Sequence, residues 1–94
     1  LEEIAKAWNL CYGNVYIKNV RTLWGSCSSQ NNINLNIHLM RLPDHLIDYV
    51  IKHELCHTIY KNHSKSFWNL LDHLTEGKVM HLKSELKTYV PRLY

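Results

Sequence analysis

The sequence lacks the features that define several common protein classes. It contains no run of about 20 consecutive apolar residues, so no segment qualifies as a membrane-spanning helix. Its 3 cysteines form no regular framework, which argues against a disulfide scaffold and favours reduced thiols in the cytoplasm. Only 3 glycines are present, and none belongs to a glycine-rich loop that could cradle nucleotide phosphates. Repeats, low-complexity tracts and interdomain linkers are also absent.

What remains is the composition of a small globular protein. The chain has 94 residues, of which 46% are hydrophobic, and a chain of this length can fold alone. We therefore expect residues 1–94 to form one domain. The net charge of +3 is mild and the lysines are dispersed along the sequence, so a solvated surface is the simplest interpretation. The alternative is a basic rim that attracts nucleic acid or acidic substrates.

One short motif carries most of the functional information. His53 and His57 are four positions apart, and Glu54 follows the first of them. Residues four apart on a helix share a face, with Cβ atoms about 5–6 Å apart, so both imidazoles can reach one zinc ion. The glutamate has the type and position of the general base in zinc hydrolases. The motif therefore predicts a zinc site with Glu54 as the catalytic residue.

A third histidine follows the motif closely. His63 would complete three protein ligands and leave one position open for water, which is typical of catalytic zinc. A continuing helix would carry His63 to another face, so we expect the helix to end with Lys61 in its last turn and Asn62 as its terminator. The alternative is that His63 is a surface residue. Surface or structural roles are expected for His38, His45, His73 and His81, which show no comparable spacing.

The residues around the motif predict the helix that it needs. Pro43 suits the first helical position, Asp44 suits the first turn, and apolar residues recur from Leu46 to Ile59 with helical spacing. On a helical wheel, Glu54 falls within the apolar sector, where an unpaired carboxylate is unfavourable. One interpretation is a glutamate that pairs with a lysine. The other, which we favour, is a base directed at a metal-activated water between the helix and a sheet.

The remaining pattern predicts an α+β fold with a small antiparallel sheet packed on the zinc helix. Strands are expected at residues 15–17, 23–27 and 33–37, the last with buried isoleucine and leucine alternating with solvated asparagine. That third strand is either an ordinary paired strand or the rim of a cleft that pairs with an extended peptide. Further helices are expected within residues 1–10, after Ser64 as an N-cap, and from Val79 to Tyr89 before Pro91.

Supporting roles can be given only as candidates. Asp72 has the right type to orient a zinc histidine. Donors for a developing oxyanion include Tyr60, His73 and the C-terminal tyrosines. Cys56 lies inside the motif but points away from the histidine pair on the wheel, so we interpret it as a packing residue. Cys27 is the other cysteine that could approach the metal.

Five motifs occur in a fixed order, and together they resemble the YgjP-like metallopeptidase domain. They are Trp24-Gly25-Ser26-Cys27-Ser28-Ser29, Asn32-Ile33-Asn34-Leu35-Asn36, Ile47-Asp48-Tyr49-Val50, His53-Glu54-Leu55-Cys56-His57 and Asn62-His63-Ser64-Lys65-Ser66-Phe67-Trp68. The resemblance covers about residues 10 to 75. This family is related to SprT-like and WLM-type metalloproteases, which share a minimal zincin core. It implies a zincin-like domain in which His53, His57 and His63 bind zinc and Glu54 is catalytic.

The sequence departs from the family pattern near a substrate groove. The differences lie at Leu23, at Ile37-His38 and at Thr58 to Lys61, so the resemblance leaves substrate preference open. Family members usually carry a further N-terminal region, and this chain begins at Leu1 without a methionine. We therefore expect residues 1–94 to be the C-terminal domain of a longer protein.

The leading hypothesis is a zinc-dependent metallopeptidase that hydrolyses peptide bonds in a peptide or protein substrate through a metal-activated water. The first alternative is a metal-dependent nucleotide phosphohydrolase, which would need a basic phosphate clamp in place of the missing glycine-rich loop. The second is a non-catalytic, zinc-stabilised module that binds a partner or nucleic acid. A closed structural site would recruit a fourth protein ligand, often a thiolate, which separates this alternative from the other two.

Overall fold

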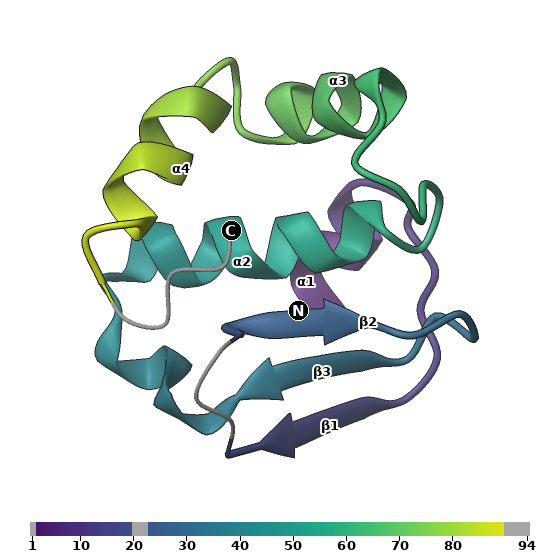
Figure 1. Cartoon of the computed structure of the whole chain (residues 1–94). Coiled ribbons are helices and arrows are strands. Elements are labelled where there is room, and N and C mark those ends of the chain that lie inside the picture. The colour runs from purple at the N-terminus through teal and green to yellow at the C-terminus, as the bar shows by residue number, and fades with distance from the viewer. Residues whose placement is uncertain (1, 20–22, 90–94) are drawn as a thin grey trace.

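The computed structural model describes residues 2–19 and 23–89, which form an α+β fold, as the sequence predicts (Figure 1). In chain order the elements are α1 (Glu2–Ala7), β1 (Val15–Lys18), β2 (Gly25–Cys27), β3 (Ile33–Asn36), the 3₁₀ helix η1 (Ile37–Arg41), α2 (Asp44–Cys56), α3 (Lys65–Leu74) and α4 (Val79–Leu86). The predicted terminator Pro91 lies outside the described residues. No helix among the described residues is long and apolar enough to cross a membrane.

The sheet is mixed, so the expected antiparallel arrangement is only half right. The strand order is β1-β3-β2, with β2 antiparallel to β3 and β1 parallel to β3. A short turn joins β2 to β3 and forces those two strands to be antiparallel. On its other edge β3 pairs with β1, which runs in the same direction. Strand patterns along a sequence do not reveal this spatial order.

The third strand is shorter than its alternating pattern predicts. It ends at Asn36, which is buried at 3% exposure, whereas Ile37 is 53% exposed. The Asn36 side chain accepts a hydrogen bond from the His38 N–H at 3.0 Å and donates one to the Leu23 carbonyl at 2.8 Å. An asparagine side chain that bonds neighbouring backbone in this way ends a strand and starts a turn. The expectation of a solvated Asn36 and a buried Ile37 was therefore wrong.

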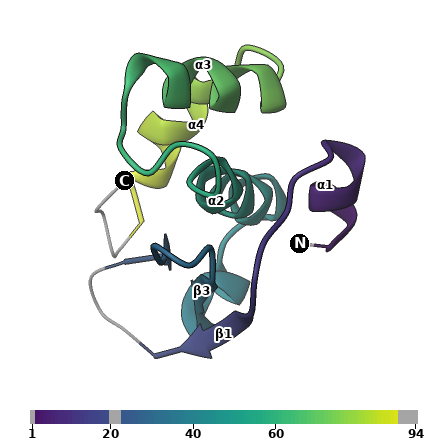
Figure 2. The ribbon, with the colours of Figure 1, turned by 90° about the vertical axis from the view of Figure 1, so that its right-hand side faces the viewer.

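The helix α2 occupies the centre of the molecule. The sheet covers one of its sides, and α3 and α4 cover the other (Figures 1 and 2). A helix with neighbours on several sides is apolar around most of its circumference. Accordingly, 8 of its residues are buried, namely Leu46, Tyr49, Val50, Ile51, His53, Glu54, Leu55 and Cys56. His53 and Glu54, the two members of that set that are not classed as hydrophobic, mark the part of the core where packing alone does not explain the sequence.

The helix α2 ends at Cys56, about one turn earlier than predicted. The Thr58 hydroxyl donates to the Leu55 carbonyl at 2.6 Å, and Tyr60 N–H donates to the Cys56 carbonyl at 2.9 Å. These bonds close the last turn and release the chain into a loop, so Lys61 and Asn62 do not belong to the helix. The next helix begins as predicted, because the Ser64 hydroxyl accepts a hydrogen bond from the Phe67 N–H at 3.3 Å.

Candidate metal centre

The three predicted metal ligands lie together. His53 lies in the last turn of α2, His57 is the C-cap residue of that helix, and the loop that follows brings His63 back beside them. One nitrogen from each ring lies within 4.8 Å of the other two, and the His57 and His63 Nε2 atoms are 3.2 Å apart. Two nitrogens bound tetrahedrally to one zinc ion at about 2.0–2.1 Å would be about 3.3 Å apart. The three side chains therefore fit a single metal ion.

The protonation state of the three imidazoles also suits the binding of a metal cation. The His57 Nδ1–H donates to the Tyr60 carbonyl at 2.9 Å, which leaves the lone pair of Nε2 directed toward His63. Burial lowers the pKa of all three imidazoles, His53, His57 and His63. At neutral pH the rings are therefore uncharged, which is the form that binds metals.

Glu54 lies beside the histidines on the side of α2 that faces the sheet. It is 1% exposed, and its Oε2 is 3.3 Å from His53 Nδ1. The sheet approaches it closely because β2 begins with a glycine. A Cβ atom at Gly25 would lie 3.1 Å from Glu54 Cγ and 3.0 Å from the Asn34 carbonyl oxygen. The carboxylate thus occupies the position between helix and sheet that the helical wheel predicts.

A pocket of about 230 Å³ opens over these groups. Its lining includes the three histidines, Glu54, Lys61 and all of β2. Because the strand order places β2 at one edge of the sheet, the rim of this pocket is an edge strand. The third strand, which we considered for that position, is the central strand of the sheet, so that interpretation was wrong.

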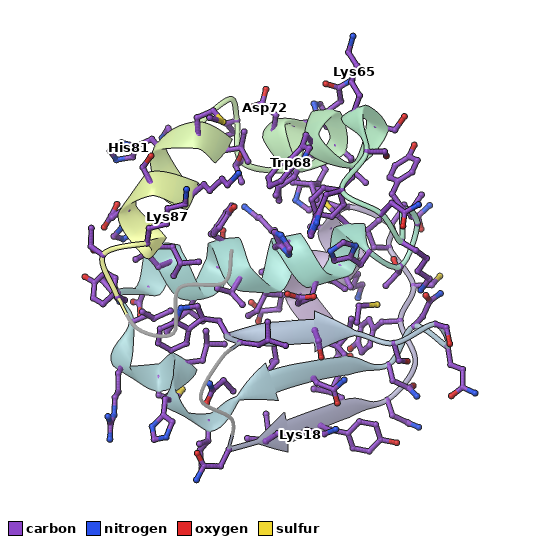
Figure 3. The ribbon with its side chains drawn as sticks, viewed as in Figure 1. Lys18, Lys65, Trp68, Asp72, His81 and Lys87 are labelled. Atoms are coloured by element: carbon purple, nitrogen blue, oxygen red, sulfur yellow. The ribbon has the colours of Figure 1, made fainter. Side chains whose placement is uncertain are left out.

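Two adjacent aromatic residues of α3 hold the histidine rings from the other side. Phe67 stacks on His57 with ring centroids 4.4 Å apart and planes inclined by 25°. Trp68 stacks on His63 at 5.7 Å and 27°. Figure 3 shows Trp68 on the side of α3 that faces α2. Phe67 is fully buried, whereas Trp68 is partly exposed. The sequence places both residues in an amphipathic helix but does not reveal their stacking on the histidines.

Trp68 is expected to restrain His63, which is exposed and belongs to a loop. Replacing Trp68 with alanine should weaken metal binding about 10-fold, because partners that orient a ligand typically contribute 10–100-fold to affinity. Competition with a chelating dye measures the change. Trp8→Ala is a matched control, since Trp8 contacts His73, a histidine outside the cluster, at 5.3 Å between centroids. Equal affinities in the two variants would contradict this role for Trp68.

Of the other candidates that the structure describes, only Cys27 shares the pocket of the three histidines; Asp72, His73 and Cys56 do not line it. Asp72 is on the outer side of α3 (Figure 3), and His73 packs against Trp8. Cys56 is fully buried, and burial raises the pKa of its thiol to about 12, which fits a packing residue. Cys27 lines the pocket, and burial also raises the pKa of its thiol.

The histidines outside the motif have the structural or surface contacts expected of them. The His45 Nε2 atom is 2.7 Å from Glu85 Oε2, and the His81 Nε2 atom is 3.7 Å from Glu85 Oε1. The His38 Nε2 atom lies 3.1 Å from the Asn19 side-chain oxygen. Among residues 2–19 and 23–89, the only group that could hold a metal ion is therefore the cluster of His53, His57 and His63.

Comparisons with known proteins agree with this geometry. The chain is similar in structure to the metallopeptidase zymogen jannalysin of Methanocaldococcus jannaschii, with a TM-score of 0.77, 25% identity and coverage of 93% of this chain and 89% of that one. The metallopeptidase zymogen abylysin of Pyrococcus abyssi has the same fold, with a TM-score of 0.78, 21% identity and coverage of 93% and 88%. A search of curated protein sequences found no match. The model of the YgjP-like metallopeptidase domain matches residues 1–89, and the chain therefore belongs to the YgjP-like metallopeptidase family.

Proposed function

We propose that this chain is a zinc-dependent peptidase in which His53, His57 and His63 hold the metal and Glu54 is the general base. The observation that carries the proposal is the convergence of three imidazole nitrogens within 4.8 Å, beside a carboxylate that lines the same pocket. Membership of a metallopeptidase family implies a metal cofactor. Three neutral imidazoles suit zinc, and a three-residue ligand set is typical of its catalytic sites.

When bound, zinc would lower the pKa of a water molecule and polarise the carbonyl of the scissile bond. Glu54 would accept the proton of the attacking water and then deliver it to the departing amine. Its position at the floor of the pocket suits this task, because the carboxylate is shielded from bulk solvent yet lies within reach of the histidines. The hydrogen bond from His57 to the Tyr60 carbonyl would keep that ring oriented during turnover.

The shape of the pocket favours a peptide over a nucleotide. Its rim is the edge strand β2, and an extended peptide can add to such an edge through backbone hydrogen bonds. A nucleotide has no peptide backbone that could pair with such an edge, and backbone N–H groups arranged in a loop are a common phosphate site. The pocket lining contains residues of a strand, a helix and a loop, but no glycine-rich turn.

The experiment is a direct comparison of two substrate classes. Zinc-loaded protein would be incubated with a peptide library and, separately, with nucleoside triphosphates, and the products identified by mass spectrometry. We expect peptide cleavage that disappears with Glu54→Gln. Nucleotide hydrolysis that depends on Glu54, without peptide cleavage, would replace this proposal by a phosphohydrolase. Zinc binding with neither activity would favour a non-catalytic module.

The glycine at the start of β2 provides a finer test. In Gly25→Ala the new methyl group would press on Glu54 Cγ, so the base must shift by a few tenths of an ångström. Because small displacements of catalytic groups reduce rates strongly, we expect kcat/KM to fall about 10-fold with zinc affinity unchanged. Kinetics on the best library peptide and a zinc titration measure both quantities. Wild-type kinetics in this variant would mean that Glu54 does not need its present position.

A further inference from the structure

Two lysines lie at or near the pocket, against the single carboxylate of its lining: Lys61 lines the pocket, and Lys83 contacts Trp68, which stacks on His63. Within residues 2–19 and 23–89, the ion pair of Lys52 with Asp48 is the only one that involves a lysine. Neither Lys61 nor Lys83, which flank the metal centre, is paired with a described carboxylate. Glu54 is the one acidic residue of the pocket lining. A bound divalent cation would add to this positive charge.

The ammonium group of Lys61 is held beside β2, where Lys61 lines the pocket. Its Nζ donates to the Ser28 carbonyl at 3.0 Å and to the Asn31 side-chain oxygen, and it lies 4.0 Å from Cys27 Sγ. All of these partners are neutral, so they orient the ammonium group without cancelling its charge. Lys61 also lines the pocket together with His57 and His63.

Lys83 supplies the second charge, from α4. Its Nζ lies 4.7 Å from the centroid of the Trp68 ring, and Trp68 in turn stacks on His63. The indole is a neutral platform that holds the ammonium group in place.

We propose that this pocket selects peptides with Asp or Glu side chains next to the scissile bond, and that Lys61 and Lys83 determine this specificity. The inference rests on the proposed peptidase function and adds a substrate class to it. An excess of one charge around a concave site concentrates ligands of the opposite charge. Both lysines are held near the cation, so a substrate carboxylate meets charges that are already in position.

The direction of β2 indicates which substrate residues lie near Lys61, those before or those after the scissile bond. Glu54 lies against Gly25, the first residue of β2, and Lys61 lies near Cys27, the last. Antiparallel strand pairing is slightly more stable than parallel pairing. A peptide that pairs antiparallel with β2 runs from the Cys27 end toward the Gly25 end. Lys61 therefore meets residues on the N-terminal side of the scissile bond.

The first test measures binding without turnover. Zinc-loaded Glu54→Gln protein would be titrated, with fluorescence anisotropy as the readout, against three labelled peptides that differ only by Asp/Glu, Asn/Gln or Lys/Arg at the positions flanking the centre. We expect the acidic peptide to bind about 10-fold more tightly than its amide counterpart, and the difference to shrink at high salt. Adding Lys61→Gln and Lys83→Gln should remove most of the difference. Equal affinities for the acidic and amide peptides would overturn the inference.

A matched control separates local charge from net charge. Lys18 is exposed on β1, on the side of the sheet farthest from α3 (Figure 3). Lys18→Gln lowers the net charge by the same amount as either single pocket variant, and we expect it to leave the preference for the acidic peptide unchanged. An equal loss of preference in Lys18→Gln and in Lys83→Gln would show that overall charge, and not the pocket, selects the peptide.

The second test uses cleavage by the wild-type protein. We expect Asp and Glu to be enriched at cleaved sites, and Lys61→Glu to reverse the preference on the N-terminal side of the bond. Cleavage without acidic enrichment would overturn the substrate class and leave the peptidase intact. Absence of any Glu54-dependent cleavage would refute the proposed peptidase function. It would also refute the proposed preference for acidic peptides as substrates. Hydrolysis of ATP that depends on both lysines would show that they bind phosphate instead.

Discussion

Replacing Glu54 with glutamine is expected to lower kcat/KM by about 10²–10⁴-fold while leaving the metal and the fold in place. Glutamine has the shape of glutamate, so the packing against Gly25 survives, but its amide cannot accept a proton from water. General-base catalysis contributes about that factor to enzymatic rates. Steady-state kinetics on the best peptide substrate, zinc analysis and thermal melting would be measured on the same preparation.

Glu85→Gln is a suitable control for that variant. Glu85 also lies beside a histidine, since its Oε2 is 2.7 Å from His45 Nε2, but it belongs to α4 and does not line the pocket. We expect this variant to retain wild-type kinetics. Undiminished turnover in Glu54→Gln, or equal losses in both variants, would remove Glu54 from the role of base.

Removing the metal is expected to destabilise the protein strongly. A ligand that binds only the folded state stabilises it by about 2.7–4.1 kcal/mol at 100 to 1,000 times its dissociation constant. For a domain of this size, 1 kcal/mol shifts the melting temperature by about 4–8 °C. Chelation should therefore lower the melting temperature by about 10–30 °C. Scanning calorimetry with and without a chelator, followed by zinc restoration, measures the shift.

The same measurement on histidine variants tests which rings bind the metal. His63→Ala should lose most of the zinc-dependent shift, because only two ligands, His53 and His57, remain. His73→Ala should keep it, since His73 packs against Trp8 outside the cluster. Near-stoichiometric zinc and a full stability shift in His63→Ala would show that the third ligand lies elsewhere.

The local features of the site can be predicted from the sequence because each depends on residues only a few positions apart. The interval between His53 and His57 fixes them on one helical face, and the apolar residues around Glu54 place it toward the core. Ser64 signals the start of α3 through its capping hydroxyl. A side chain whose role depends only on neighbouring residues of the same helix can be recognised without knowing the fold.

The features that escaped sequence analysis depend on partners far along the chain. The position of β3 between β1 and β2 follows from how the strands assemble, and this order decides that β2 forms the rim of the pocket. The early end of α2 is an exception, because it follows from local hydrogen bonds of Thr58 and Tyr60, whose residue types do not predict it. Lys83 contacts Trp68, which stacks on His63, only because α4 packs near α3.

The central claim is that three imidazoles share one metal ion, and X-ray absorption spectroscopy of the zinc-loaded protein tests it most directly. We expect a shell of light atoms at about 2.0–2.1 Å, with the multiple-scattering signal of three imidazole rings. A zinc–sulfur distance of about 2.3 Å would instead mean that a thiolate such as that of Cys27, which lines the pocket, completes a closed site. That spectrum would contradict the hydrolytic centre that we propose.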